Sequence, residues 1–182
     1  ITYGFSENAD VRAEGWRQIE TTSFFDVVVR ATGDRLSVQI GMPGRHNVLN
    51  ALAAVAVALD QDLEHSAIKR GLAEFAGVGR RFEVVGQCCV GDAAFLLVDD
   101  YGHHPSEVRA TIDAVRASWP QKRVVMIYQP HRYSRTNELF DQFVEVLKSV
   151  DVLLLTEVYA AGEAPILGST GFDLYERLRL EM

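Results

Sequence analysis

The sequence predicts an α/β protein whose second half is built on a mainly parallel β-sheet. From Ala94 onward, short apolar segments alternate with longer amphipathic ones, which is typical of strands joined through helices in right-handed crossovers. Pro105 stands at the first position of one expected helix, where proline is favoured. The expected elements are a strand at 94–98, a helix at 105–118, a strand at 123–128, a helix at 137–149, a strand at 152–156 and a last helix from 172.

The first half predicts a hairpin, two helices and a second hairpin. Phe24–Ile40 alternates around a Gly33 turn, and residues 82–90 and 94–98 do so around Gly91. The helix expected at 45–59 is apolar nearly all round and should be buried, whereas that at 63–75 should pack through Ile68, Leu72 and Phe75. The flexible Gly-Val-Gly segment at 77–79 predicts a boundary between domains 1–78 and 79–182.

Composition narrows the class of protein. Among 182 residues, 48% are apolar and the formal net charge is −7, which argues against a broad nucleic-acid surface but not against one local basic pocket. Cys88 and Cys89 are adjacent and badly placed for a mutual disulfide, so a reduced, cytoplasmic protein is expected. No segment reaches the roughly 18 apolar residues of a membrane helix, and no signal pattern opens the chain. Because the opening lacks Met and reads like the interior of a strand and its turn, a fragment is expected.

Polar side chains gather after two of the expected strands. The segments VDDYGHHP, from Val98, and YQPHRYSRT, from Tyr128, each follow an apolar run and precede a helix. In an open α/β sheet the carboxyl ends of strands are where ligands bind. We therefore expect these two segments to carry the chemistry.

Five cations and no acid lie between Ala114 and Asn137. Three of them (Arg116, Lys122 and Arg123) can be read as solvated surface charges. Arg132 and Arg135 differ, because they flank Tyr133 and Ser134 in an expected loop beside His131, directly after a strand. Two planar guanidinium groups in such a place suit a carboxylate or a phosphate.

The start of the helix at 45–59 holds His46, Asn47 and Asn50. The two asparagines share one helix face. They can be side chains that cap a buried helix end, or amides that read an edge such as that of adenine. The sequence leaves both interpretations open.

The first strand-end segment also allows several interpretations. Asp99 and Asp100 can cap the next helix, accept the hydroxyls of a ribose or bind a metal. His103 and His104 can be zinc ligands, but no cysteine or regular histidine spacing supports a metal site, and none is predicted. No GxxxxGK[ST] loop for a triphosphate occurs in the chain.

These motifs together resemble the Mur ligase family. The resemblance is carried by GRHNVLNALAAVAVAL, GVGRRFE, VDDYGHHPSEV, YQPHRYSRT and LLTEVYAAGEAPI, and it covers Ile1 to about Leu167. It implies the end of a P-loop-type central ATPase domain followed by a Rossmann-like, mainly parallel C-terminal domain, both incomplete. Within the family, DDYGHHP narrows the resemblance to the branch that adds L-alanine to UDP-N-acetylmuramate through an acyl phosphate and to a recycling relative. QPHRYSRT followed by TEVYAAGE favours the alanine-adding branch.

The resemblance also implies residue roles. His46, Asn47 and Asn50 match positions at the adenine, and Arg81 and Asp100 match positions that approach the ribose and phosphates of ATP. The positions of the L-alanine pocket are matched by Tyr101, His131, Arg132 and Arg135. The implied ligands are ATP, Mg²⁺, UDP-N-acetylmuramate and L-alanine, with the magnesium ligands and phosphate loop outside this chain.

Two other functions remain compatible with the sequence. A recycling ligase that attaches a peptide to the same sugar would share DDYGHHP but should lack the HRYSRT segment. A noncatalytic nucleotide- or amino-acid-binding module would explain why no phosphate loop is present. Neither nucleic acid nor a membrane is an expected partner, and the sequence does not indicate an oligomeric state.

Overall fold

The computed structural model describes residues 1–181, which separate into two compact units. The first unit contains Ile1–Tyr101 and Ala117–Trp119, and the second contains Gly102–Arg116 and the chain from Pro120 onward. A boundary between domains at Val78 stays a prediction, because this division follows contacts and not the order of the chain.

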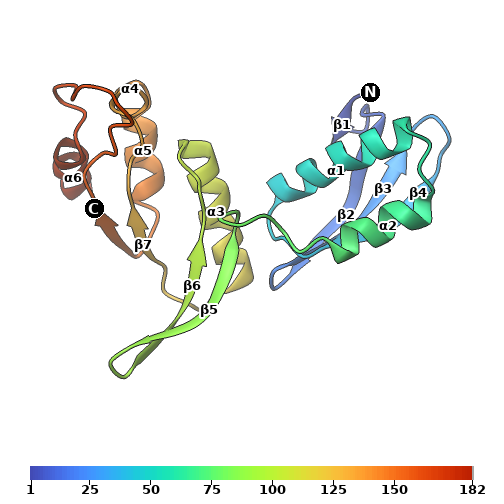
Figure 1. Cartoon of the computed structure of the whole chain (residues 1–182), viewed down its shortest axis with the longest axis horizontal. Helices are drawn as coiled ribbons and strands as arrows, with labels where there is room; N and C mark the ends of the chain where they lie inside the picture. Colours follow the sequence, from blue (N-terminus) through green and yellow to red (C-terminus); the bar gives the residue numbers. More distant parts are fainter. Residues whose placement is uncertain (182) are drawn as a thin grey trace. The chain divides into compact units, whose positions relative to one another are not determined.

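A four-stranded sheet forms the base of the first unit (Figure 1). Its strands are β1 (Tyr3–Gly4), β2 (Val11–Ile19), β3 (Thr22–Val29) and β4 (Arg35–Ile40), in the order β1-β2-β3-β4. Strand β1 runs parallel to β2, and the other pairs are antiparallel. The hairpin predicted around Gly33 is confirmed as β3 and β4.

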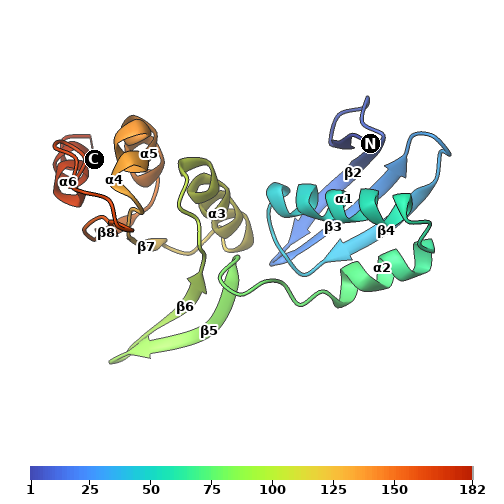
Figure 2. The same ribbon diagram turned by 45° about the horizontal axis from the view of Figure 1, so that its top comes forward.

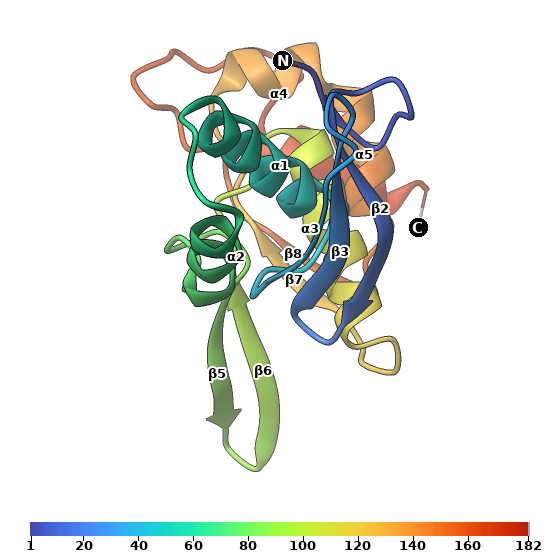
Figure 3. The same ribbon diagram turned by 90° about the vertical axis from the view of Figure 1, so that its right-hand side faces the viewer.

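Two helices, α1 (Arg45–Asp60) and α2 (His65–Glu74), lie on one face of this sheet, as Figures 1 and 3 show. The buried side chains between the layers are Val11, Ala13, Phe25, Val27, Leu36, Val38, Ile40, Met42, Val48, Ala51, Leu52, Val55, Ala56 and Ile68. The expectation that α1 is buried is correct in part. Only one of its faces meets the sheet, and Val57 on the other face is 65% exposed. Phe75, expected in the core, ends α2 and is 46% exposed.

The second predicted hairpin is present as an antiparallel ribbon of β5 (Glu83–Val90) and β6 (Ala93–Asp99), with its turn at Gly91 (Figure 3). Strand β6 was expected to belong to the parallel sheet of the second half. Within residues 1–181 it pairs with β5 alone, because the short turn at Gly91 permits an immediate antiparallel return.

The second unit alternates helices and parallel strands, as the apolar pattern predicts. Its elements are α3 (Pro105–Ser118), whose last two residues group with the first unit, β7 (Val125–Tyr128), α4 (Tyr133–Glu138), α5 (Phe140–Leu147), β8 (Val152–Leu155) and α6 (Gly171–Arg179). Strands β7 and β8 pair in parallel, with Tyr128 opposite Leu155. The helix expected at 137–149 is two helices, and the first begins inside the YQPHRYSRT segment.

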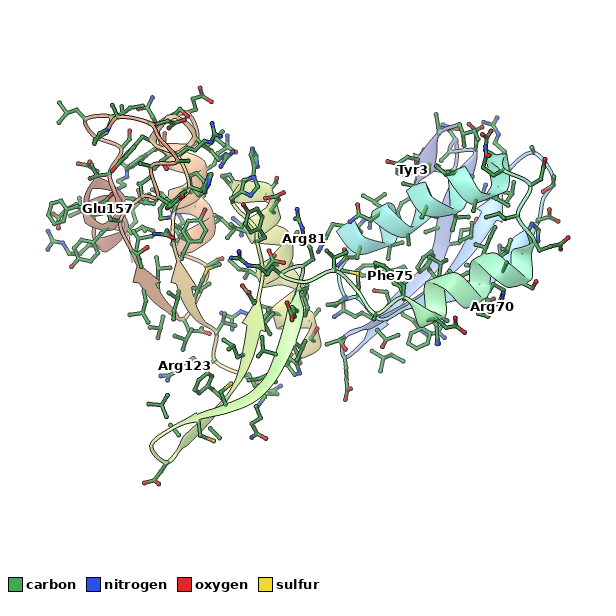
Figure 4. The ribbon with its side chains drawn as sticks, in the orientation of Figure 1. Tyr3, Arg70, Phe75, Arg81, Arg123 and Glu157 are labelled. Atoms are coloured by element: carbon green, nitrogen blue, oxygen red, sulfur yellow. The ribbon has the colours of Figure 1, made fainter. Side chains whose placement is uncertain are left out.

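The core of the second unit joins α3, α5 and α6 to β7 (Figure 2). Phe143, Leu147 and Leu174 are fully buried there. The start of α6 is fixed by a capping box between Thr170 and Asp173. Glu157, labelled in Figure 4, also accepts a hydrogen bond from the first backbone N–H of α6, at 2.7 Å. The end of β8 and the start of α6 are therefore tied together.

Cys88 and Cys89 are both free. Within residues 1–181, no helix combines the length and the hydropathy needed to cross a membrane.

Candidate functional site

The carboxyl ends of β7 and β8 meet at one edge of their sheet, and the polar segments after both strands are joined there. The backbone N–H of Arg132 donates to the carbonyl of Tyr159 at 2.9 Å, and the N–H of Tyr159 donates to the carbonyl of Pro130 at 2.8 Å. The rings of His131 and Tyr159 stack with their centroids 5.3 Å apart. Parallel pairing of two strands thus builds one site from residues 128–136 and 159–163.

His131 and Arg135 form the inner part of this site. The Nη1 atom of Arg135 donates to the His131 carbonyl at 3.0 Å and lies 3.4 Å from the ring atom Nδ1 of His131. The ring of His103, from the segment before α3, lies 6.1 Å from that of His131. A guanidinium presents five N–H donors, so donors of Arg135 remain for a ligand.

Arg132 holds an unusual backbone conformation at the turn from β7 into α4. Its φ of 73° lies in the left-handed region, which non-glycine residues seldom adopt and which costs free energy. The Arg132 carbonyl accepts hydrogen bonds from the backbone N–H and the hydroxyl of Thr136, at 3.1 and 2.9 Å. Its guanidinium is half exposed and lies 3.6 Å from Glu163.

The electrostatics of the site favour a neutral imidazole between cations. Burial, followed by the charges of Arg135, His103 and Arg132, lowers the pKa of His131 below its usual value. The pKa of Glu163 is lowered mainly by the hydrogen bonds that it accepts from Ser134, so this carboxylate is ionised at neutral pH. The positive charge that could attract an anion therefore comes from the two arginines.

The expectation that YQPHRYSRT is a loop is partly wrong. Arg132 precedes α4, whereas Arg135 is on α4. Tyr133, between the two arginines, and Thr136, directly after Arg135, are buried. The helix begins early because the carboxylate of Glu163 accepts a hydrogen bond from the N–H of Ser134, one of the first-turn donors that has no partner within a helix.

Tyr101, the fourth residue predicted for this pocket, belongs to the other compact unit. It is 46% exposed, its N–H donates to the carbonyl of Arg80 at 2.7 Å, and the Arg80 guanidinium lies over its ring. Its place beside Arg132 and Arg135 stays a prediction.

The asparagines predicted for adenine lie in the first two turns of α1, but neither caps it. Gly44 is the N-cap and no side chain caps the helix. Asn47 is buried and donates from Nδ2 to the carbonyl of Pro43 at 2.8 Å, while its Oδ1 accepts from Asn50 at 3.4 Å. Asn50 is exposed, so Asn47 orients an amide that has a carbonyl oxygen and a further N–H for a ligand. His46 is half-buried in the same turn.

Arg81 and Asp100 lie at the base of the β5–β6 ribbon. Arg81, labelled in Figure 4, is exposed between Arg80 and Phe82, both of which have positive φ values, 58° and 50°. The Oδ2 atom of Asp100 accepts from the N–H of Phe82 at 2.8 Å, which ties the two ends of the ribbon together. That this pair and the α1 asparagines meet on one nucleotide stays a prediction.

Residues for which the sequence left alternatives open have partners within the chain. The N–H groups of His103 and His104, before α3, donate to Glu107, so a residue of the helix itself supplies the acceptor. Arg116 forms an ion pair with Asp151 at 2.9 Å. Across residues 1–181, no group of three or more His, Cys, Asp or Glu side chains is placed to hold a metal ion.

Three residues of the site were not among those predicted: His103 as a neighbour of His131, Tyr159 and Glu163. The signal for the last two was present, because they follow β8 just as His131 follows β7. Since the carboxyl ends of parallel strands share one edge, the segment after the last strand should have been placed beside HRYSRT.

Comparison with known proteins assigns both halves of the chain. Residues 1–58 match the family model described as Mur ligase middle domain, and residues 80–181 match that described as Mur ligase, glutamate ligase domain. The UDP-N-acetylmuramate–alanine ligase of Thermotoga maritima is 25% identical, with a TM-score of 0.78 over 100% of this chain and 37% of that one.

Two further solved structures share the fold. MurF ligase from Thermotoga maritima, in complex with ADP, is 20% identical, with a TM-score of 0.60 over 83% of this chain and 34% of that one. A pseudomurein peptide ligase type C from Methanothermus fervidus is 23% identical, with a TM-score of 0.65 over 80% and 27%. The chain thus spans 27–37% of the length of these three proteins. Because the glutamate ligase domain alone accounts for residues 80–181, this chain belongs to the Mur ligase family.

Proposed function

We propose that this chain is part of an ATP-dependent ligase that joins L-alanine to UDP-N-acetylmuramate. The observation that carries the proposal is the pair of arginines around His131 at the carboxyl end of β7. Alanine offers only a methyl group, an amine and a carboxylate, so most of its affinity must come from the carboxylate. Paired guanidinium groups are the strongest side-chain means of holding one.

The donors in the pocket are only partly used by the chain itself. Arg135 donates one N–H to the His131 carbonyl, and the ion pair of Arg132 with Glu163 is long, at 3.6 Å. Each guanidinium therefore keeps donors for a carboxylate. His131 is neutral at pH 7 because its pKa is lowered, so its ring adds no repulsion toward the α-ammonium of alanine.

The neutral imidazole also suits the reaction. Alanine must lose a proton from its ammonium group before its amine attacks an activated carboxyl group. A neutral ring of His131 adds no further positive charge beside that amine, while Arg132 and Arg135 fix the carboxylate and stabilise charge that develops near them. Positioning, more than acid–base chemistry, is then the contribution of this chain.

ATP supplies the phosphoryl group that activates the muramate carboxyl as an acyl phosphate. The exposed amide of Asn50, oriented by buried Asn47, fits one edge of adenine, which presents a donor and an acceptor side by side. Arg81 and Asp100 are proposed to approach the ribose and phosphates. The resemblance to the Mur ligases implies that Mg²⁺ is held by residues outside 1–182. Support for ATP also comes from the Thermotoga MurF ligase, whose structure is a complex with ADP.

The test uses the complete ligase with UDP-N-acetylmuramate, ATP and a panel of amino acids and peptides, and measures ADP release. We expect L-alanine to be the best acceptor. Preference for a murein peptide would identify the recycling ligase instead, and absence of any ADP release with every acceptor would favour a binding module.

A further inference from the structure

The carboxylate of Glu163 is held by the start of α4. Its Oε2 atom accepts from the backbone N–H of Ser134 at 3.0 Å, and its Oε1 atom accepts from the Ser134 hydroxyl at 2.8 Å. The same Oε1 lies 3.6 Å from Nη1 of Arg132. One carboxylate therefore connects a helix terminus to one of the two arginines of the pocket.

The backbone around Glu163 is shaped for this contact. Ala161 and Gly162 both have positive φ values, 50° and 86°, and the N–H of Glu163 donates to the carbonyl of Ala160. Tyr159, just before this tight turn, is hydrogen-bonded to Pro130 and Arg132, and the turn directs the chain that follows back toward α4. Such strain persists only where surrounding contacts determine the conformation.

We infer that Glu163 is a positioning residue that orients the guanidinium of Arg132 for the carboxylate of the amino-acid substrate. The inference rests on the proposed function of the pocket and adds a residue to it. Arginine side chains have large rotamer freedom, and a partner that restricts this freedom before binding lowers the entropy lost on binding. Two bonds to Ser134 fix the carboxylate, so Glu163 can serve as a rigid reference for Arg132.

The contact is also weak enough not to compete with substrate. A half-exposed ion pair at 3.6 Å contributes little stability and leaves the outer donors of the guanidinium available. A carboxylate bonded directly through both oxygens would instead neutralise Arg132.

The alternative role for Glu163 is that of a helix cap with no influence on Arg132. Glu163→Gln separates the two roles, because the amide oxygen can still accept from the Ser134 N–H but carries no charge for a guanidinium. In the complete ligase we expect it to raise KM for alanine about 3- to 10-fold, the effect of ordering one long side chain, with kcat nearly unchanged. If Glu163 were only a cap, Glu163→Gln would leave KM for alanine unchanged.

A matched control is available in the same segment. Glu157 also accepts from two backbone N–H groups, one at the start of α6, and among the described residues it forms no ion pair. Glu157→Gln should leave KM for alanine at the value of the unchanged enzyme. Ser134→Ala, which removes one of the two bonds that fix Glu163, should raise KM in the same direction by a smaller factor and serves if Glu163→Gln does not fold.

A double-mutant cycle with Arg132→Ala decides the inference. We expect Glu163→Gln, or Ser134→Ala in its place, to have no further effect on KM once Arg132 is removed. An effect of equal size with and without Arg132 would overturn the positioning role. If Arg132→Ala raises KM for another substrate and not for alanine, the proposed amino-acid pocket is wrong, and the same cycle on that other KM still tests whether Glu163 acts through Arg132.

Discussion

Replacing the two arginines of the pocket one at a time should separate binding from structure. Arg135 is partly buried and donates to the His131 carbonyl at 3.0 Å, whereas Arg132 is half exposed and makes only a long ion pair with Glu163. Arg135→Ala therefore removes a hydrogen bond that holds the turn before α4. Arg132→Ala removes no comparable internal bond.

The expected magnitudes follow from these contacts. Loss of the partner of the His131 carbonyl should lower the free energy of local opening by about 1–2 kcal/mol. Loss of the exposed ion pair of Arg132 should change it by about 0–1 kcal/mol. Either substitution leaves a substrate carboxylate without one charged partner, at about 2–4 kcal/mol, which corresponds to a fall in kcat/KM for alanine of about 30- to 1000-fold.

Two assays on the complete ligase measure the two effects. Hydrogen exchange of the peptide 128–139 should become about 5- to 30-fold faster in Arg135→Ala and change little in Arg132→Ala. Steady-state kinetics should show that both substitutions lower kcat/KM for alanine. Lysine at either position should restore little of this activity, because a point charge lacks the planar fork of a guanidinium. Kinetic losses on ATP or on UDP-N-acetylmuramate would refute the assignment of the pocket, and equal exchange in the two variants would refute the structural role of Arg135.

Other predictions concern the rest of the chain. Gly171→Ala should destabilise the protein by about 1–3 kcal/mol in thermal unfolding, because the added Cβ would lie 2.6 Å from a carbonyl oxygen at the end of β8. Gly71→Ala, in α2 with open space around it, should stabilise it by about 0.5–1 kcal/mol. A Gly171→Ala variant more stable than Gly71→Ala would contradict the packing at the start of α6. The lowered pKa of His131 means that the unfolded chain binds more protons just below pH 6.5, so its contribution to stability is present above that pH and is lost as the pH falls toward the folded pKa. His131→Gln should therefore reduce the change in the urea-denaturation midpoint with pH between pH 5 and 6.5. If the midpoint of this variant depends on pH as strongly as that of the unchanged protein, the lowered pKa of His131 is excluded. Asn50→Ala should raise KM for ATP about 5- to 150-fold, from about 1–3 kcal/mol, with KM for alanine unchanged. An unchanged KM for ATP would leave this amide without a role in nucleotide binding.

Elements with local signals were predictable from the sequence. The helix from Pro105 to Ser118 has the bounds that its proline and apolar spacing indicate, and both hairpins lie around the predicted glycine turns. Strand β2 was missed because a bulge between Glu14 and Arg17 breaks its alternation of buried and exposed residues.

The start of α4 could not be predicted by rules on neighbouring residues. No side chain near Arg132 caps the helix, and the acceptor for the first-turn N–H of Ser134 is Glu163, far along the chain. A sequence pattern that reports only neighbours therefore places the start of the helix four residues late. The same long-range contact explains why Glu163 was not recognised as part of the site, although the segment LLTEVYAAGEAPI that contains it was recognised as a family motif.

The separation of Ser134 and Glu163 by 29 residues also bears on how the pocket assembles as the protein folds. Such a long-range contact has a larger entropic cost of loop closure than a contact between neighbours, and the turn into α4 depends on it. During synthesis, His131, Arg132 and Arg135 leave the ribosome well before the residues that fix them. A shortened chain that ends before Gly162 would contain both arginines of the pocket and would still lack Glu163, the partner of the Arg132 guanidinium.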